Sequence, residues 1–168
     1  MSSAVSIIRQ DGEGERMWFA GGGAFTWKAT AAETGGAFIL IEDRMEGGKV
    51  TPFHVHPNED EAIYVLEGEL LVDVEGEQQR VGPGGFFFAP RGVPHAFMVT
   101  SDSARVLALQ TPGTGESFYR EAGEPVESDA DAARPADWAR LRRVAEGSAC
   151  IELVGPPPFE AAKPAAAS

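Results

Sequence analysis

The sequence has a single cysteine, Cys150, so no disulfide can form within the chain. We interpret Cys150 as a partly buried structural thiol, because no histidine lies near it in the sequence. Basic residues are also scarce: 14 Lys and Arg stand against 26 Asp and Glu, for a formal net charge of −12. The short basic stretch from Arg140 to Arg143 is interpreted as the polar face of a helix. Nucleic acid and anionic membrane surfaces are therefore not expected as partners.

Long hydrophobic runs are missing as well. No apolar segment reaches the length of a membrane span, and residues 1–17 contain no hydrophobic stretch of the signal-peptide kind. We therefore expect a cytoplasmic protein with no membrane partner. The hydrophobic fraction of 43% is that of a globular chain, and its 20 glycines and 12 prolines favour many short elements joined by tight turns.

Short segments rich in β-forming residues follow one another from Met17 to Thr111, and most are separated by glycine. Their spacing predicts an all-β sandwich or barrel rather than alternating strands and helices. Gly21–Gly23 lacks the downstream lysine of a phosphate-binding loop and is interpreted as a turn. The expected strands cover residues 18–19, 24–30, 37–42, 53–56, 61–66, 69–74, 78–81, 86–89, 95–100 and 105–110.

The character of the chain changes after this region. We expect a short helix over residues 117–122 and a longer one over 131–145, with Pro135 near its start and Gly147 as its stop. Residues 151–159 are expected to run extended along the barrel. The predicted organisation is a flexible segment (1–16), a β-barrel domain (17–112), a helical extension packed on the barrel (113–160) and a disordered tail (161–168).

The chain has only three histidines, and all of them fall in two segments that predict a metal site. Residues two apart in a strand share a face, so His54 and His56 point the same way, and a turn at Pro57–Asn58 can return Glu61 to that face. A turn from Pro90 to Pro94 then delivers His95 at the head of another strand. Three imidazoles and a carboxylate suit one divalent transition metal: Mn, Fe, Ni, Co or Zn.

Two further carboxylates compete with Glu61. Asp60 should lie on the opposite face of a strand that continues through Glu61, and Glu59 belongs to the turn. Both are interpreted as solvated acids, which leaves Glu61 as the ligand.

These residues resemble the paired motifs of the cupin superfamily. The first motif is a glycine, five residues, His-x-His, four residues, Glu, six residues and a glycine, and it is matched from Gly48 to Gly68. The second is a glycine, five residues, Pro-x-Gly-x-x-His, matched from Gly84 to His95; the asparagine that usually closes it after three more residues is replaced here by Val99. Among cupins, the run from His54 to Gly68 is similar to small single-domain proteins grouped with quercetin dioxygenases.

The resemblance implies a double-stranded β-helix, or jelly roll, with one metal near the barrel axis. It also implies a homodimer, because cupins of this kind commonly pair. Strand alternation further predicts an apolar, aromatic pocket around the metal for a small organic substrate. On the strand 86–89, either Phe86 with Phe88 or Phe87 must face inward. The side chains expected to line this pocket are Ile63, Val65, Phe86, Phe88 and Phe97.

Three functions fit these features. The first is an oxygenase acting on a small aromatic or enolic compound, with Glu61 as a metal ligand that also serves as general base. The second is an isomerase, cyclase, lyase or decarboxylase in which the metal acts as a Lewis acid without redox change. The third is a non-catalytic module that binds a small ligand. We favour an enzyme, and dependence on dioxygen separates the first function from the second.

Overall fold

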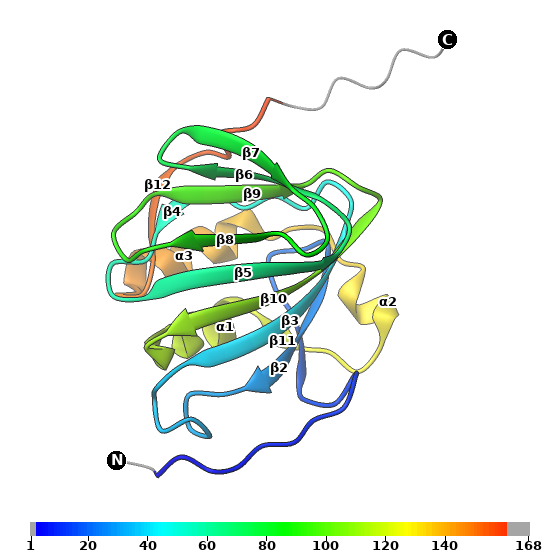
Figure 1. The fold of residues 1–168 in the computed structure, drawn as a ribbon, viewed down its shortest axis with the longest axis vertical. Helices are drawn as coiled ribbons and strands as arrows, with labels where there is room; N and C mark the ends of the chain where they lie inside the picture. The colour runs from blue at the N-terminus through cyan, green and yellow to red at the C-terminus, as the bar shows by residue number, and fades with distance from the viewer. Residues whose placement is uncertain (1–2, 161–168) are drawn as a thin grey trace.

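The computed structural model describes residues 3–160 and folds them mainly into two antiparallel sheets (Figure 1). One sheet has the strand order β11-β1-β2-β3-β10-β5-β8, and the other, in the upper part of Figure 1, has the order β12-β4-β9-β6-β7. The predicted all-β jelly roll is therefore confirmed. The strands are β1 (Arg16–Trp18), β2 (Gly23–Ala29), β3 (Ile39–Glu46), β4 (Phe53–Val55), β5 (Asp60–Glu67), β6 (Leu70–Val74), β7 (Glu77–Val81), β8 (Phe86–Ala89), β9 (His95–Val99), β10 (Ser103–Thr111), β11 (Glu124–Pro125) and β12 (Glu152–Gly155).

Alternating side chains of both sheets form the core of the barrel. On β5, Ile63 and Val65 are buried while Tyr64 between them is exposed, as the pleat of a half-buried strand requires. Burial of these apolar side chains is the main force that holds the two sheets together. The apolar core cluster between the two sheets consists of Met45, Ile63, Val65, Leu70, Val72, Phe87, Phe97, Val99, Ala104 and Val106.

The three consecutive glycines at the start of β2 belong to the turn between β1 and β2, as predicted. All three have positive φ angles, of 84°, 71° and 120° for Gly21, Gly22 and Gly23, which side-chain-bearing residues rarely adopt. A Cβ atom on Gly23 would also come within 2.1 Å of the Arg44 carbonyl oxygen. The segment thus turns the chain from β1 into β2, in agreement with its interpretation as a turn.

The chain after β10 is helical in three short pieces, after a single 3₁₀ turn at Gly113–Gly115. The first predicted helix is confirmed as α1 (Glu116–Ala122), but the second is wrong as a single helix. It is divided into α2 (Asp129–Ala132) and α3 (Trp138–Gly147), because Pro135 lacks an N–H and disfavours helical geometry at Arg134 before it. Asp137 begins α3 by accepting a hydrogen bond from the Arg140 amide at 2.9 Å.

The C-terminal extension packs closely against the barrel. Its helices α1 and α3 share an apolar cluster with Ile151, and β12, which follows Ile151, pairs with β4 of the five-stranded sheet. Residues 152–155 of the expected extended segment therefore form a strand of the barrel itself. The members of this cluster are Phe118, Ala122, Leu141, Val144, Ala145 and Ile151.

Residues 3–15, before β1, contain no helix or strand but contact the sheet region. The Val5 amide donates to the Glu33 carbonyl at 2.9 Å, and Arg9 forms an ion pair with the Glu33 carboxylate at 2.6 Å. The expected tail at 161–168 lies outside the described residues. Within the described part of the chain, no helix is long and apolar enough to span a membrane.

Candidate metal centre

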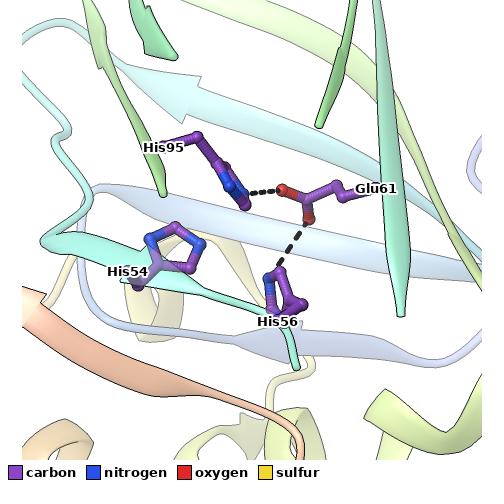
Figure 2. Close-up of side chains that lie close together, drawn as sticks. All are labelled: His54, His56, Glu61 and His95. Atoms are coloured by element: carbon purple, nitrogen blue, oxygen red, sulfur yellow. Dashed lines mark hydrogen bonds and ion pairs between the residues drawn. The ribbon is translucent and has the colours of Figure 1, made fainter. Parts of the chain in front are cut away.

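The predicted ligands come from three strands that meet inside the barrel. β4 and β9 are antiparallel neighbours in which His54 is paired directly with His95. His56 follows the last residue of β4, and Glu61 enters from β5 of the other sheet. Figure 2 shows the three imidazoles and the carboxylate facing a common centre. The structure thus brings together all four side chains that the spacing of the motif predicts.

Each imidazole is oriented by a backbone carbonyl. Nδ1 of His54 donates to the Pro52 oxygen at 2.8 Å, and Nδ1 of His95 donates to the Val93 oxygen at 2.9 Å. Nδ1 of His56 donates to the carbonyl of Cys150 at 2.8 Å. With Nδ1 occupied in this way, Nε2 of each ring is left to face the centre, and such a partner is the usual means of fixing a ligating imidazole.

The carboxylate of Glu61 lies between two of the rings and a glutamine. Its Oε2 is 2.9 Å from Nε2 of His95, and its Oε1 is 3.9 Å from Nε2 of His56 (Figure 2). Gln110, which pairs with Glu61 across β10 and β5, donates from Nε2 to the same Oε1 at 3.0 Å. The carboxylate is therefore fixed in place from both sides.

The four side chains have the arrangement that a bound cation needs. One ligand atom from each residue can be chosen so that all four lie within 4.8 Å of one another. All four side chains are buried, with exposures of 6% for His54, 3% for His56, 5% for Glu61 and 1% for His95. Nitrogen and carboxylate donors of this kind suit first-row divalent metals, so the residues present fit such an ion.

The protonation of the cluster also prepares it for a metal. Burial, with the nearby rings of His95 and His56, lowers the pKa of His54 to about 3, so this ring is neutral at physiological pH. Burial alone would raise the pKa of Glu61, but the hydrogen bond with His95 and the three imidazoles outweigh it and hold that pKa well below its usual range. The site therefore offers a neutral nitrogen donor and an ionised carboxylate.

His95 behaves differently from His54. Burial alone would lower the pKa of His95, but its hydrogen bond and ion pairing with Glu61 raise it above the ordinary value. In the metal-free protein the proton on Nε2 of His95 therefore faces the Glu61 carboxylate. A divalent cation between the two groups would take the place of that proton.

Gln110, which is buried, and Tyr119, which is partly buried, are polar partners of the cluster that the sequence analysis missed. Besides Glu61, Nε2 of Gln110 contacts Nε2 of His56 at 3.2 Å and the Tyr119 hydroxyl at 2.9 Å. Burial, with the charge of Glu61, raises the pKa of Tyr119 well above its usual value, so its hydroxyl stays protonated. The missed signal was a polar residue in phase with the inward-facing Val106 and Ala108 on β10.

The two carboxylates beside Glu61 have different surroundings, and one expectation needs correction. Glu59 is not solvated: it is 1% exposed, and its Oε1 accepts a hydrogen bond from the Thr114 hydroxyl. The 3₁₀ turn after β10 covers it, a long-range contact that the local sequence pattern does not indicate. Asp60 pairs with Arg91 at 2.8 Å, and hydrogen bonds from Arg91 lower its pKa to about 2.

A cavity of about 80 Å³ adjoins the cluster. Ile63 and Phe97 line it as expected, together with aromatic side chains of β2 and α1. On its outer side, Val50, Pro52, Leu141 and Ile151 also line a larger surface groove of about 1080 Å³ between α3 and β12. These four residues form the wall between the cavity and the groove.

Three residues expected in the pocket lie elsewhere. Phe86 and Phe88 are 58% and 48% exposed on the outer face of β8, and Phe87 points into the core instead. The register of β8 on β5, which pairs Phe87 with the inward-facing Ile63, decides this face. Val65 is fully buried in the core cluster and is not among the residues that line the cavity.

Cys150 is partly buried, as the sequence suggested. Its Sγ contacts the Thr114 carbonyl oxygen at 3.3 Å, so it packs on the 3₁₀ turn. The backbone of Cys150 matters more to the site than its thiol, because its carbonyl is the acceptor for His56.

Comparison with known proteins agrees with this arrangement. A model of the cupin domain matches residues 41–112, which contain all four clustered side chains. Among solved structures, an RMLC-like cupin from Shewanella frigidimarina shares the fold, with a TM-score of 0.58 at 22% identity over 70% of this chain and 99% of that one.

Two curated relatives are similar in sequence. Quercetin 2,3-dioxygenase of Bacillus subtilis is 26% identical over 150 residues, which are 89% of this chain and 44% of that protein. Dimethylsulfoniopropionate lyase DddQ of Ruegeria pomeroyi is 39% identical over 67 residues, which are 39% of this chain and 31% of that protein. The chain thus spans less than half the length of either relative.

Proposed function

Because the chain is a small member of the cupin superfamily, we propose that it is a metal-dependent enzyme, of the oxygenase type, acting on a small enolic or hydroxylated organic compound. The observation that carries the proposal is the buried cluster of His54, His56, Glu61 and His95 next to a cavity. The similarity to quercetin 2,3-dioxygenase over 89% of the chain supports the oxygenase type.

The four clustered side chains would hold one ion of Mn, Fe, Ni, Co or Zn. When bound, such an ion supplies Lewis acidity and, if it is redox-active, electron exchange with dioxygen. Four protein ligands would leave two positions of a six-coordinate ion for substrate. The apolar walls of the cavity, including Ile63 and Phe97, would exclude water from the bound substrate.

Glu61 is the group of this chain placed to move a proton. It is ionised at neutral pH. It could accept the proton of a substrate hydroxyl whose own pKa is lowered by a bound metal. Gln110 holds Oε1 by a hydrogen bond, which leaves Oε2, now 2.9 Å from His95, as the oxygen that accepts. The Tyr119 hydroxyl oxygen accepts a hydrogen bond from Nε2 of Gln110 at 2.9 Å and so holds this side chain in turn.

The size of the cavity restricts the substrate. Pockets for drug-sized ligands commonly enclose roughly 300–1000 Å³, whereas this cavity is about 80 Å³. A compound of flavonol size would enter only if the wall formed by Val50, Pro52, Leu141 and Ile151 moved. We therefore expect a smaller substrate than a flavonol.

The small cavity also favours a second candidate function, a lyase or decarboxylase that acts on a small acid without dioxygen. The similarity to the DddQ lyase over 67 residues supports it. In this case Glu61 would accept a proton from carbon or oxygen of the substrate while the metal stabilised the resulting enolate.

The decisive experiment is metal analysis followed by turnover with and without oxygen. Protein purified without added metal is expected to contain close to one equivalent of a divalent transition metal, and oxygen uptake is expected with small enolic compounds. Turnover under strictly anaerobic conditions would contradict the oxygenase and support the lyase or decarboxylase. A protein that binds small ligands but changes none of them, under any metal or gas condition, would contradict both.

We further propose a homodimer, as is common in this superfamily. Tyr64, Phe86 and Phe88 support it, because they are exposed next to one another on the outer face of β5 and β8. Light scattering is expected to give twice the mass of the 17.8 kDa chain. Phe86→Ser combined with Phe88→Ser should shift that mass towards one chain, and an unchanged mass would contradict the use of this face.

A further inference from the structure

A charged residue lies on the inner face of β3, next to the cavity. Ile41 and Met45 on this strand are buried in apolar clusters, and Asp43 alternates in phase with them. The carboxylate therefore points into the barrel and lines the cavity beside the metal cluster. An ionisable side chain on the interior face of a small barrel needs a partner or a function.

Its partner is Lys49, from the loop between β3 and β4. Nζ of Lys49 is 3.2 Å from Oδ2 of Asp43, and the two side chains are only 6% and 16% exposed. Lys49 lines the same cavity. The stem of Lys49 passes over Gly22, where a Cβ atom would come within 3.1 Å of the Lys49 Cβ. The turn before β2 thus leaves room for this lysine to reach inside.

The pair keeps unused hydrogen-bonding capacity. A lysine ammonium has three donors, but the hydrogen bonds of residues 3–160 give Nζ of Lys49 a single acceptor. Oδ1 of Asp43 is buried and has no partner among these residues. A buried ion pair of this kind is no efficient source of stability, because desolvation offsets the attraction of the charges. A ligand in the cavity could use both the spare donors and the spare acceptor.

We propose that Lys49 is the anion-binding residue of the cavity and that the substrate is a small monocarboxylic acid with a hydroxyl or keto oxygen. This inference rests on the proposed metal-dependent function. Lys49 donates to the carboxylate, Oδ1 of Asp43 accepts from a hydroxyl of the substrate or a water, and a remaining oxygen of the substrate faces the metal cluster.

The charged groups around the cavity would be balanced by a substrate with a single negative charge. A divalent ion with the ionised Glu61 and three neutral imidazoles would carry one net positive charge. Asp43 and Lys49 cancel one another, so a single negative charge on the substrate would make the enclosed site neutral. Because desolvated charge is costly, a site of this kind should discriminate between a carboxylate and its uncharged analogue.

The alternative is that the pair only ties the β3–β4 loop to the barrel. Substitution would then change stability but not the preference for charged ligands. The two cases are separated by comparing glycolate with glycolamide, which have the same size and hydroxyl group but differ in charge.

The experiment measures binding of both probes to the metal-loaded protein by calorimetry, for the wild type, Lys49→Met and Lys49→Arg. We expect the wild type to prefer glycolate, Lys49→Met to weaken glycolate binding roughly tenfold or more while leaving glycolamide unchanged, and Lys49→Arg to retain part of the preference. Equal binding of glycolate by wild type and Lys49→Met, or no binding of glycolate to the wild type, would overturn the inference.

Metal content and thermal unfolding of each variant are measured in parallel. A wild-type protein that takes up no metal would contradict the proposed function, whereas metal uptake without charge preference would contradict only the role of Lys49. If Lys49→Met does not fold, Lys49→Gln supplies the uncharged variant, and the same loss of glycolate preference is expected.

Discussion

The barrel and the C-terminal extension orient the metal cluster in different ways. His54 and His95 are each fixed by a carbonyl only two residues earlier in the sequence, within or next to their own strands. His56 is fixed by Cys150, 94 residues later, and Glu61 is held by Gln110, whose side chain contacts Tyr119 of α1. Local chain geometry thus orients His54 and His95. The extension orients His56 directly and reaches Glu61 only through Gln110 of β10. The barrel motif alone does not account for a preorganised site.

The largest effect is expected from removing a locally held ligand. His54→Ala or His95→Ala should lower metal affinity by more than roughly 100-fold, since loss of a supporting partner alone commonly costs ten- to a hundredfold. Metal content after dialysis, measured by mass spectrometry, checks this. Circular dichroism of each variant serves as the control for folding. Full metal occupancy of His54→Ala would show that the ligand assignment is wrong.

The comparison between the two regions becomes sharper with a matched pair of core variants. Leu141→Ala in the extension and Leu70→Ala in the barrel each truncate a buried leucine, at 5% and 0% exposure, and should each cost about 2–5 kcal/mol of stability. Only Leu141 also belongs to the cluster that packs Ile151 against α1 and α3.

Metal affinity should therefore fall in Leu141→Ala and stay unchanged in Leu70→Ala, at temperatures where both remain folded. Urea unfolding and metal titration measure the two quantities separately. Equal metal affinity in the two variants would mean that the extension does not support the site.

A smaller effect is expected at Gln110, the residue of β10 that links Glu61 to Tyr119 of the extension. Gln110→Ala should weaken metal binding about 10- to 100-fold, because Oε1 of Glu61 loses its buried donor while all four ligands remain. Tyr119→Phe keeps the ring and removes only the hydroxyl that Gln110 contacts, so its effect should be smaller. An effect of Tyr119→Phe larger than that of Gln110→Ala would reverse the proposed order of the contacts.

The smallest expected effect is the pH dependence of the free energy of unfolding that His54 produces in the metal-free protein. The pKa of His54 is about 3 in the fold against 6.5 for an ordinary histidine, so between these values the unfolded chain binds the extra proton. Stability should then fall with decreasing pH, by up to about 1.4 kcal/mol per unit. The raised pKa of His95 has the opposite sign, but its contribution is already complete below pH 6.5.

Urea unfolding between pH 6.5 and about 5.5 measures this slope, in a range that lies above the ordinary pKa of 4.5 at which Glu61 begins to contribute. His54→Gln cannot take up the proton and should flatten the dependence. An equally steep slope in that variant would assign the loss of stability to another group.

Much of the barrel and the four clustered side chains could be predicted from the sequence because they depend on local spacing. The alternation of His54 and His56, the glycine-marked turns and the Pro-x-Gly turn before His95 each specify geometry over a few residues. Asp43 and Gln110 were not identified, although each is a polar residue in phase with apolar inward neighbours on its strand. Such residues signal the interior site only once the inner face of the strand is known.

The remaining differences arise from long-range contacts. The inner face of β8 is decided by its register on β5, so Phe87 rather than Phe86 or Phe88 enters the core. Glu59 is covered by the Thr114 turn, 55 residues later in the chain. No local pattern contains this information.

The hydrogen bond from His56 is accepted by the main-chain oxygen of Cys150, so the amino acid at position 150 is free to vary. Any amino acid at position 150 presents the same oxygen, so exchange of Cys150 for serine or alanine should leave the orientation of the ring intact. What must be preserved is the path of the backbone between α3 and β12. Substitution tolerance at that position would therefore say nothing about its importance, whereas an insertion or deletion in the loop would disturb the ring at once.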